Sequence, residues 1–125
     1  MKIRVYYEDT DTGGIVYHSN YINFCERARS EAFFSRGLSP DLDVSGFVAK
    51  KLEANFLQPA KLGDMLEVKT QLVEMKSASF ILKQTIFREN IKIFELIITL
   101  AHINTEGKPQ KMGELKELVQ RLFND

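Results

Sequence analysis

The residues best suited to chemistry lie in one short segment near the N-terminus, between an alternating strand pattern and a helix pattern. Two carboxylates, two threonines, two glycines and a histidine occur there, in the run Asp9-Thr10-Asp11-Thr12-Gly13-Gly14-Ile15-Val16-Tyr17-His18-Ser19-Asn20-Tyr21. Glycines let a backbone approach a ligand closely, and the first turn of a helix presents unpaired N–H groups with a partial positive charge. Such N–H groups suit an oxyanion, and a carboxylate beside them can attack a carbonyl or activate water. Asp11 is the candidate for that carboxylate.

The same composition is also typical of an ordinary turn with a helix cap, and composition alone favours neither interpretation. A calcium loop fits poorly, because it needs an oxygen ligand at its fifth position and a glutamate at its twelfth. Counted from Asp9, these positions are Gly13 and Asn20. A zinc site is disfavoured because it needs more ligands than His18 and the nearby carboxylates, and His102 is the only other histidine.

An aspartic protease is the third alternative, since Asp11-Thr12-Gly13 has the Asp-Thr-Gly form of that family and a short chain can supply half of a dimeric site. In that family the triplet normally follows an apolar strand directly. Here it follows Asp9-Thr10, and no later apolar-apolar-glycine element completes the usual loop. The sequence therefore disfavours a protease.

The composition predicts one globular domain, residues 1–125, with 44% apolar and 27% charged residues. Lysine plus arginine and aspartate plus glutamate balance at 17 each, whereas nucleic-acid binders usually carry a basic surplus, so no nucleic-acid partner is expected. The single cysteine, Cys25, excludes a disulfide within the chain. The longest apolar stretch, Ile93–Ile103, is too short to span a bilayer, and the N-terminus lacks the apolar region of a signal peptide. We expect a soluble cytoplasmic protein without a membrane span.

The elements that must position Asp11 can be predicted from periodicity. Ile3–Tyr7 alternates like a half-buried strand. A helix over about residues 19–36 follows the polar segment, with an N-cap at Ser19 or Asn20 and a Schellman-type end at Gly37-Leu38. The chemistry-bearing segment therefore joins a strand to the start of a long helix.

The rest of the chain alternates with the period of strands. Residues 38–46 have the composition of a loop, and from Phe47 onward the period is two. The strands are separated by short turns, at Gly63-Asp64, Lys76-Ser77 and Glu89-Asn90. Short turns between long strands indicate an antiparallel meander, and an amphipathic helix over Leu115–Phe123 ends the chain.

This order predicts an α+β domain in which one antiparallel sheet packs against one main helix. The strand Ile93–Ile103 is apolar on both faces. Since one helix covers only one face, the other face needs either the terminal helix or a partner subunit, and an oligomer is expected.

Several fixed positions then match a known signature: Arg4-Val5, Thr10-Asp11, Gly14-Ile15-Val16, His18 and Tyr21. In this pattern the chain resembles the 4-hydroxybenzoyl-CoA thioesterase family. It is most similar to the bacterial acyl-CoA thioesterases associated with the Tol–Pal system, the YbgC group, and the similarity extends over the whole chain. The resemblance implies a hot-dog fold, in which a curved antiparallel sheet wraps around one long central helix, with a short C-terminal helix.

The resemblance also implies roles for individual residues. Asp11 is expected to be the catalytic carboxylate, as nucleophile or general base, since an aspartate is ionised at neutral pH. The His18 backbone N–H is expected to polarise the thioester carbonyl, and its side chain to orient water or substrate, or else to cap the helix or lie at an interface. Tyr7, Ser77 and Ser79 are candidates for substrate binding, with a core position as the alternative for Tyr7.

Other polar residues are expected to be structural. Cys25 lies on the apolar stripe of the helix and should be an inert core thiol, His102 should be a packing or surface residue, and Asp9 a turn carboxylate. The candidates for the phosphates of coenzyme A, none of which the sequence singles out, are Lys50, Lys51, Lys76, Lys83 and Arg88.

Together these expectations describe a thioesterase of lipid metabolism that hydrolyses acyl-CoA, or acyl carrier protein thioesters, to a free acid and a thiol. No cofactor is expected, because coenzyme A is part of the substrate, and the expected assembly is a homodimer or homotetramer. The alternative is a non-catalytic acyl-binding or interaction module of lipid synthesis or of the Tol–Pal system. Asp11 and His18 count against this alternative, because a binder needs no carboxylate aimed at the carbonyl.

Overall fold

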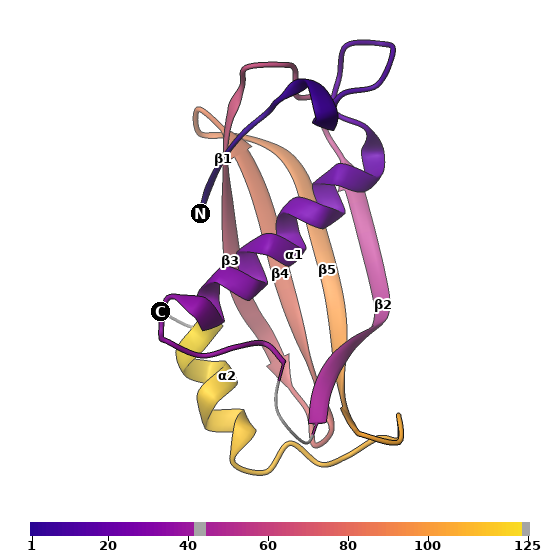
Figure 1. Ribbon diagram of the computed structural model, residues 1–125, viewed down its shortest axis with the longest axis vertical. Coiled ribbons are helices and arrows are strands. Elements are labelled where there is room, and N and C mark those ends of the chain that lie inside the picture. Colours follow the sequence, from indigo (N-terminus) through magenta and orange to yellow (C-terminus); the bar gives the residue numbers. More distant parts are fainter. Residues whose placement is uncertain (42–44, 124–125) are drawn as a thin grey trace.

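A curved antiparallel sheet wraps around one long helix in the computed structural model, which describes residues 1–41 and 45–123 (Figure 1). The elements in chain order are β1 (Lys2–Arg4), a 3-10 turn η1 (Tyr7–Asp9), α1 (His18–Phe34), β2 (Ser45–Phe56), β3 (Met65–Met75), β4 (Ser79–Arg88), β5 (Ile91–Asn104) and α2 (Leu115–Phe123). This arrangement confirms the predicted hot-dog fold. The first strand is shorter than predicted, since Tyr7 already belongs to η1. The predicted loop 38–46 includes residues 42–44, which lie outside the described residues.

The sheet has the strand order β1-β3-β4-β5-β2, and every pairing is antiparallel. The register shifts between Ala49 and Lys51 in β2 and between Leu72 and Glu74 in β3. Such bulges bend a strand and increase its twist. The sheet is therefore curved, and its concave face receives α1.

The core lies between α1 and the concave face of the sheet. Alternate residues of the two central strands face the helix and are at most 1% exposed: Phe80, Leu82 and Ile86 in β4, and Phe94, Leu96 and Ile98 in β5. The helix buries Tyr21, Phe24, Cys25 and Ala28 against them, at the predicted spacing of three and four.

The two ends of α1 differ in how well the sequence predicted them. The helix begins at His18, and its N-cap residue, Tyr17, makes no side-chain cap, so the predicted cap at Ser19 or Asn20 is wrong. At the other end, the Leu38 N–H donates to the carbonyl oxygen of Phe33 (3.0 Å), and Gly37 has a φ of 72°. This is the predicted Schellman-type end, although α1 stops two residues earlier than expected.

The terminal helix α2 lies on the same side of the sheet as α1. Its Phe123 ring packs against Phe33 of α1 and Phe80 of β4, and Val119 is fully buried. Hence α2 does not cover the convex face, where Ile97 and Ile103 of β5 stay half-buried. Within residues 1–41 and 45–123, no helix is long and apolar enough to cross a membrane.

Candidate active site

Backbone hydrogen bonds fold the loop before α1 around Asp11. The Asp11 N–H donates to the carbonyl oxygen of Ile15 (2.9 Å), and the Gly14 N–H donates to the carbonyl oxygen of Asp11 (3.0 Å). Gly14 has a φ of 79°, which glycine adopts without the steric penalty of a side chain. The turn therefore needs glycine at this position to return the chain toward α1.

Asp9 ties this loop to the helix. Its buried carboxylate accepts a hydrogen bond from the Tyr6 N–H (2.9 Å). Its carbonyl oxygen accepts from the Tyr17 N–H (2.9 Å) and from the side-chain amide of Asn20 (2.9 Å). Asp9 is thus the turn carboxylate that the sequence predicted, and Asn20 braces the loop instead of capping the helix.

The Asp11 carboxylate is exposed and is held through one oxygen. Its Oδ1 accepts a hydrogen bond from the Gly13 N–H (2.8 Å), and a Cβ at Gly13 would lie only 3.1 Å from this oxygen. Oδ2 has no protein partner among the described residues. One oxygen is therefore positioned by the backbone while the other is available to a ligand.

The first turn of α1 leaves a donor free beside this carboxylate. Because no side chain caps the helix, the His18 N–H has no acceptor among the described residues. The His18 ring lies against the rings of Tyr17 (4.4 Å between centroids) and Phe56 (6.4 Å). The ring is thus held at the mouth of the site.

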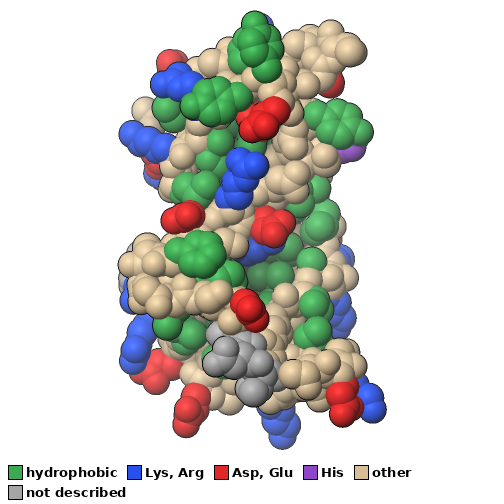
Figure 2. All heavy atoms as spheres, in the orientation of Figure 1, with side chains coloured by type: hydrophobic (Ala, Val, Ile, Leu, Met, Phe, Trp, Pro, Cys, Tyr) green, Lys and Arg blue, Asp and Glu red, His purple; other side chains and the backbone are tan. Residues whose placement is uncertain are grey.

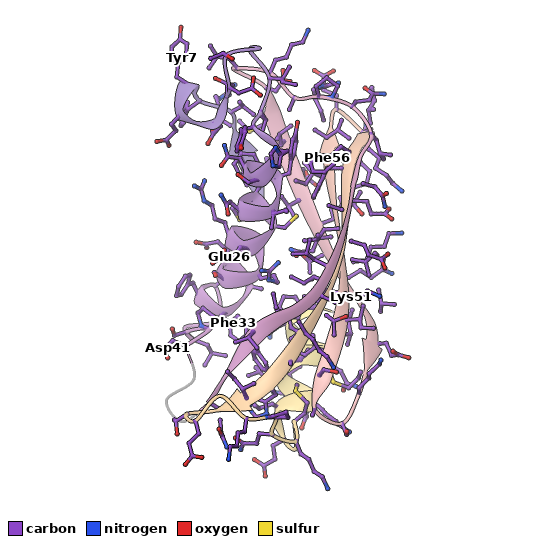
Figure 3. All side chains as sticks on the ribbon, turned by 90° about the vertical axis from the view of Figure 1, so that its right-hand side faces the viewer. Tyr7, Glu26, Phe33, Asp41, Lys51 and Phe56 are labelled. Atoms are coloured by element: carbon purple, nitrogen blue, oxygen red, sulfur yellow. The ribbon has the colours of Figure 1, made fainter. Side chains whose placement is uncertain are left out.

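A cavity of about 420 Å³ brings these groups together. It is lined by Asp11, Ile15, Val16, His18, Tyr21, Phe56, Leu57, Gln58 and Pro59. Figure 3 shows Phe56 near the end of β2, across from the first turns of α1. The walls are mostly apolar, and the loop and the helix start supply most of the polar groups, as in a typical small-molecule site.

Aromatic rings close the cavity on the side of the core. Tyr21 stacks on Phe94 (5.1 Å between centroids), and Phe56 lies 5.1 Å from the same ring. The Tyr21 hydroxyl accepts a hydrogen bond from the Ala60 N–H (3.0 Å). Burial raises the pKa of Tyr21, and the Ala60 hydrogen bond partly opposes this effect.

Arg88 contacts the segment after β2 that forms one wall of the cavity. It donates from Nη1 to the carbonyl oxygen of Pro59 (2.7 Å) and from Nη2 to Oε1 of Gln58 (3.2 Å), and it pairs with Asp64 (3.3 Å). Arg88 therefore has a structural position. Three of the lysines considered for the phosphates of coenzyme A are also paired, in Lys51–Glu53, Lys76–Glu74 and Lys83–Glu95.

The other candidates for substrate binding lie outside this cavity. Tyr7 is 81% exposed on η1 and does not line it. Ser77 and Ser79 lie at the β3–β4 turn. In the register of β5, Ser79 is level with Ala101, seven residues from Phe94 at the cavity, or about 23 Å along the strand. Within one chain, Asp11 and His18 line the same cavity, whereas Tyr7, Ser77 and Ser79 do not.

The two remaining polar residues singled out in the sequence are buried. Cys25 is fully buried, and burial raises the pKa of its thiol to about 12. His102 is 2% exposed, and its Nδ1 lies 3.0 Å from the carbonyl oxygens of both Gln110 and Lys111. Both are packing residues, as the sequence predicted.

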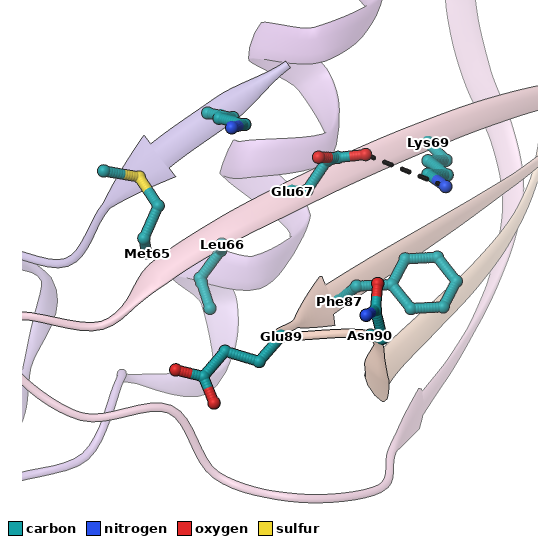
Figure 4. Close-up of a pocket in the computed structure, with 8 residues that line it drawn as sticks. Met65, Leu66, Glu67, Lys69, Phe87, Glu89 and Asn90 are labelled. Atoms are coloured by element: carbon teal, nitrogen blue, oxygen red, sulfur yellow. Dashed lines mark ion pairs between the residues drawn. The ribbon is translucent and has the colours of Figure 1, made fainter.

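A smaller hollow of about 280 Å³ lies beside β1 and β3, near the β4–β5 turn (Figure 4). Glu67 and Lys69 pair across 3.8 Å on its wall, and Lys69 lies 5.3 Å from the centre of the Phe87 ring. These are ordinary contacts of a strand surface, and neither Asp11 nor His18 lines this hollow. The candidate active site is the cavity that both Asp11 and His18 line.

Comparison with known proteins identifies the family of this chain. The profile of the family described as "Thioesterase superfamily" matches residues 13–95. The chain belongs to the thioesterase superfamily. The resemblance noted from the signature residues is thereby confirmed.

Individual thioesterase-superfamily relatives are similar over different spans. The acyl-CoA thioesterase YbgC of Helicobacter pylori is 47% identical over 87 residues, which cover 70% of this chain and 65% of that protein. The acyl-CoA thioesterase YbgC of Haemophilus influenzae is 35% identical over 122 residues, which cover 94% of this chain and 89% of that protein. A solved structure, the probable thioesterase of Bartonella henselae, has a TM-score of 0.83 at 34% identity and covers 89% of this chain and 95% of that one.

Proposed function

We propose that this protein is an acyl-CoA thioesterase that hydrolyses the thioester bond to a free acid and coenzyme A. The observation that carries the proposal is the geometry of one cavity. The Asp11 carboxylate, with one oxygen unengaged, and the uncapped start of α1 at His18 both open onto it. The YbgC relatives, which are named acyl-CoA thioesterases, support the substrate class.

In this mechanism the thioester carbonyl oxygen accepts a hydrogen bond from the His18 N–H. Negative charge grows on that oxygen as the carbonyl carbon is attacked, and losing one such donor typically costs about 3 kcal/mol in the barrier. Partial positive charge at the helix start adds to the same effect.

Asp11 acts in one of two ways on the carbonyl carbon. As a nucleophile, its free oxygen attacks the carbon, the thiolate of coenzyme A leaves, and water then hydrolyses the mixed anhydride to release the acid. As a general base, it takes a proton from a water molecule, whose oxygen attacks instead, and the proton passes to the leaving thiolate. Either route needs only groups of the chain and water, so we propose no resident cofactor.

The assembly proposed for this chemistry is a homodimer, or a homotetramer built from such dimers, in the cytoplasm. The thiol carrier is coenzyme A, with acyl carrier protein as the alternative. We assign substrate contacts to Tyr7, Ser77 and Ser79 only in such an assembly, since none of them lines the cavity of its own chain.

The test is release of free thiol from acyl-CoA substrates of short to long chain, with Asp11→Asn as the deciding variant. We expect kcat to fall at least about a hundredfold while the fold survives, because Asp11 is exposed and makes one local hydrogen bond. Glu8→Gln is the matched control, since Glu8 is an exposed carboxylate in the preceding turn, and it should keep full activity.

Two results would contradict the proposal. Unchanged turnover by folded Asp11→Asn would remove Asp11 from the mechanism. Wild-type protein that binds acyl-CoA but releases no thiol from any chain length would favour the non-catalytic module.

A further inference from the structure

Tyr21 lies one helical turn beyond His18 and reaches into the same cavity. It is only 4% exposed, and stacking on Phe94 fixes the plane of its ring. Side chains of a helix lean toward its N-terminus, and residues three apart share one face. Tyr21 is therefore directed back toward the first turn, where the His18 N–H is free.

The hydroxyl of Tyr21 is oriented by the backbone. A phenol oxygen accepts hydrogen bonds and donates one. Its acceptor side is engaged by the N–H of Ala60, a fully buried residue, at 3.0 Å. Its own proton has no acceptor among the described residues, so the group offers a buried donor to whatever fills the cavity.

The phenol also stays protonated over the working range of pH. Burial raises the pKa of Tyr21 above its ordinary value; the Ala60 hydrogen bond and Arg88 oppose this, and the Asp64 and Asp11 carboxylates add to it. A neutral phenol is a donor throughout neutral pH.

We propose that the Tyr21 hydroxyl donates a hydrogen bond to the thioester carbonyl oxygen, as a second donor beside the His18 N–H. This inference rests on the proposed thioesterase function and adds a catalytic residue to it. The two donors come from one face of α1, whereas the group that must accept a proton or attack carbon, Asp11, comes from the loop. The two donors therefore reach the carbonyl oxygen of a bound thioester from α1, while Asp11 reaches its carbonyl carbon from the loop.

Tyr21→Phe removes the hydroxyl and keeps the ring. We expect kcat for thiol release to fall about a hundredfold with KM changed less than about threefold, because the charge on the carbonyl oxygen develops mainly in the transition state. Tyr6→Phe is the control: Tyr6 is 61% exposed, precedes the loop and does not line the cavity, and its variant should keep wild-type kinetics.

A thioether analogue, in which the substrate carbonyl is replaced by CH₂, separates this role from packing. Calorimetry should give the same Kd for wild type and Tyr21→Phe, because the analogue has no oxygen to accept the bond. A kcat within threefold of wild type would overturn the inference, and so would a loss of thioether affinity as large as the loss in kcat/KM.

Tyr21→Phe also leaves the Ala60 N–H without its acceptor, which lowers the stability of the fold. A second variant tests the donor without this loss. Incorporation of 3,5-difluorotyrosine at position 21 keeps the oxygen and lowers the pKa of the phenol. We expect kcat/KM to gain an alkaline decline that wild type lacks, as the donor ionises. An unchanged pH profile in this folded protein would overturn the inference.

The two proposals fail in different ways. Loss of activity in Asp11→Asn with normal kinetics in Tyr21→Phe would overturn only the role of Tyr21. Absence of thiol release by the wild type would overturn the function itself.

Discussion

The Asp11 carboxylate owes its orientation to a single backbone donor, the Gly13 N–H, and to the absence of a side chain on that glycine. This hydrogen bond engages only Oδ1. The other oxygen can therefore attack a carbonyl carbon or accept a proton from water, so the geometry suits either mechanism. Sequence reasoning found Asp11 from its neighbours and the family signature. It could not find the hydrogen bond from Gly13, because which amide faces a carboxylate depends on the dihedral angles of the whole loop.

Gly13→Ala tests this positioning. The added Cβ would lie 3.1 Å from Oδ1, so the carboxylate must shift by a few tenths of an ångström, and we expect kcat to fall about tenfold with little change in KM. Gly46→Ala is the matched control, because Gly46 has open space around its Cβ position and no positive φ. Equal kinetics for both variants would show that the Gly13 contact does not position the carboxylate.

The two routes open to Asp11 differ in where an oxygen atom goes. During repeated turnover in ¹⁸O-labelled water, nucleophilic attack gives a mixed anhydride whose hydrolysis can place ¹⁸O in the Asp11 carboxylate. General-base catalysis places ¹⁸O only in the released acid. Mass spectrometry of the peptide that contains Asp11, after several turnovers with excess substrate, separates the two outcomes.

Cys25 gives a prediction about pH, because burial raises the pKa of its thiol from 9.0 to about 12. As the pH rises, the thiol ionises in the unfolded chain before it ionises in the folded protein. The contribution of the neutral thiol to the free energy of unfolding is therefore complete below about pH 9 and is lost as the pH rises toward 12, at roughly 1.4 kcal/mol per pH unit. Urea titrations should therefore show a steeper alkaline loss of stability in wild type than in Cys25→Ala. A thiol reagent should label native Cys25 slowly at pH 8, and rapid labelling would contradict this burial.

At the scale of elements, α1 is anchored to the sheet by a polar contact that periodicity does not reveal. Gln84 of β4 is fully buried, and its Nε2 donates to the carbonyl oxygen of Cys25 (2.8 Å) and to Thr70 Oγ1 (3.0 Å). Its Oε1 accepts from Arg29 Nη1 (2.8 Å). An alternation pattern can place a residue on the inner face of a strand, but it does not say which polar partners a buried amide will find.

Removing this amide should loosen the helix from the sheet. Gln84→Leu leaves the half-buried Arg29 guanidinium without its hydrogen bond, and we expect unfolding to become easier by about 2 kcal/mol in urea titrations. Gln71→Leu, on the exposed part of β3, should change stability by less than about 0.5 kcal/mol. Adding Arg29→Met to Gln84→Leu should recover part of the loss, and no recovery would mean that Arg29 is not the group left unpaired.

The start of α1 illustrates why the elements were easier to predict than their ends. Hydrophobic spacing located the helix and its buried stripe, and Gly37 located its C-terminus. Ser19 and Asn20 have the composition of an N-cap, yet the helix begins before them, because the Asp9 carbonyl binds Asn20 and the Tyr17 N–H. Tertiary contacts thus overruled a local preference, and the result is an uncapped terminus that faces the cavity.

At the scale of the whole molecule, β2 forms a long uncovered edge of the sheet. Among the described residues, β2 pairs only with β5, whereas β3 at the opposite side pairs with β1 over Met65–Glu67 and is contacted by α2. Exposed apolar side chains follow β2, at Val48 (43%), Leu52 (42%) and Phe56 (51%). Figure 2 shows hydrophobic side chains along this side of the molecule. A long exposed edge of this kind invites pairing with another chain.

A two-fold axis across β2 would bring part of the partner subunit to the end of the sheet that holds the cavity. Antiparallel pairing of two β2 strands places the end of one beside the start of the other. The β3–β4 turn of one subunit, which contains Ser77 and Ser79, then lies at the same end of the combined sheet as the cavity of the other. In such an assembly the contacts proposed for these serines would be with substrate in the partner's cavity, since the cavity of their own chain lies about 23 Å away along the strand.

The double variant Val48→Asp/Leu52→Asp tests this assembly. Four added carboxylates near the axis would repel one another, and we expect the mass in sedimentation equilibrium to fall to that of one chain, with thiol release lost in parallel. Val73→Asp is the matched control, because Val73 is 56% exposed on β3, away from β2, and it should leave mass and activity unchanged. A monomeric wild-type protein, or a double variant that dissociates yet keeps full activity, would show that one chain completes the site alone.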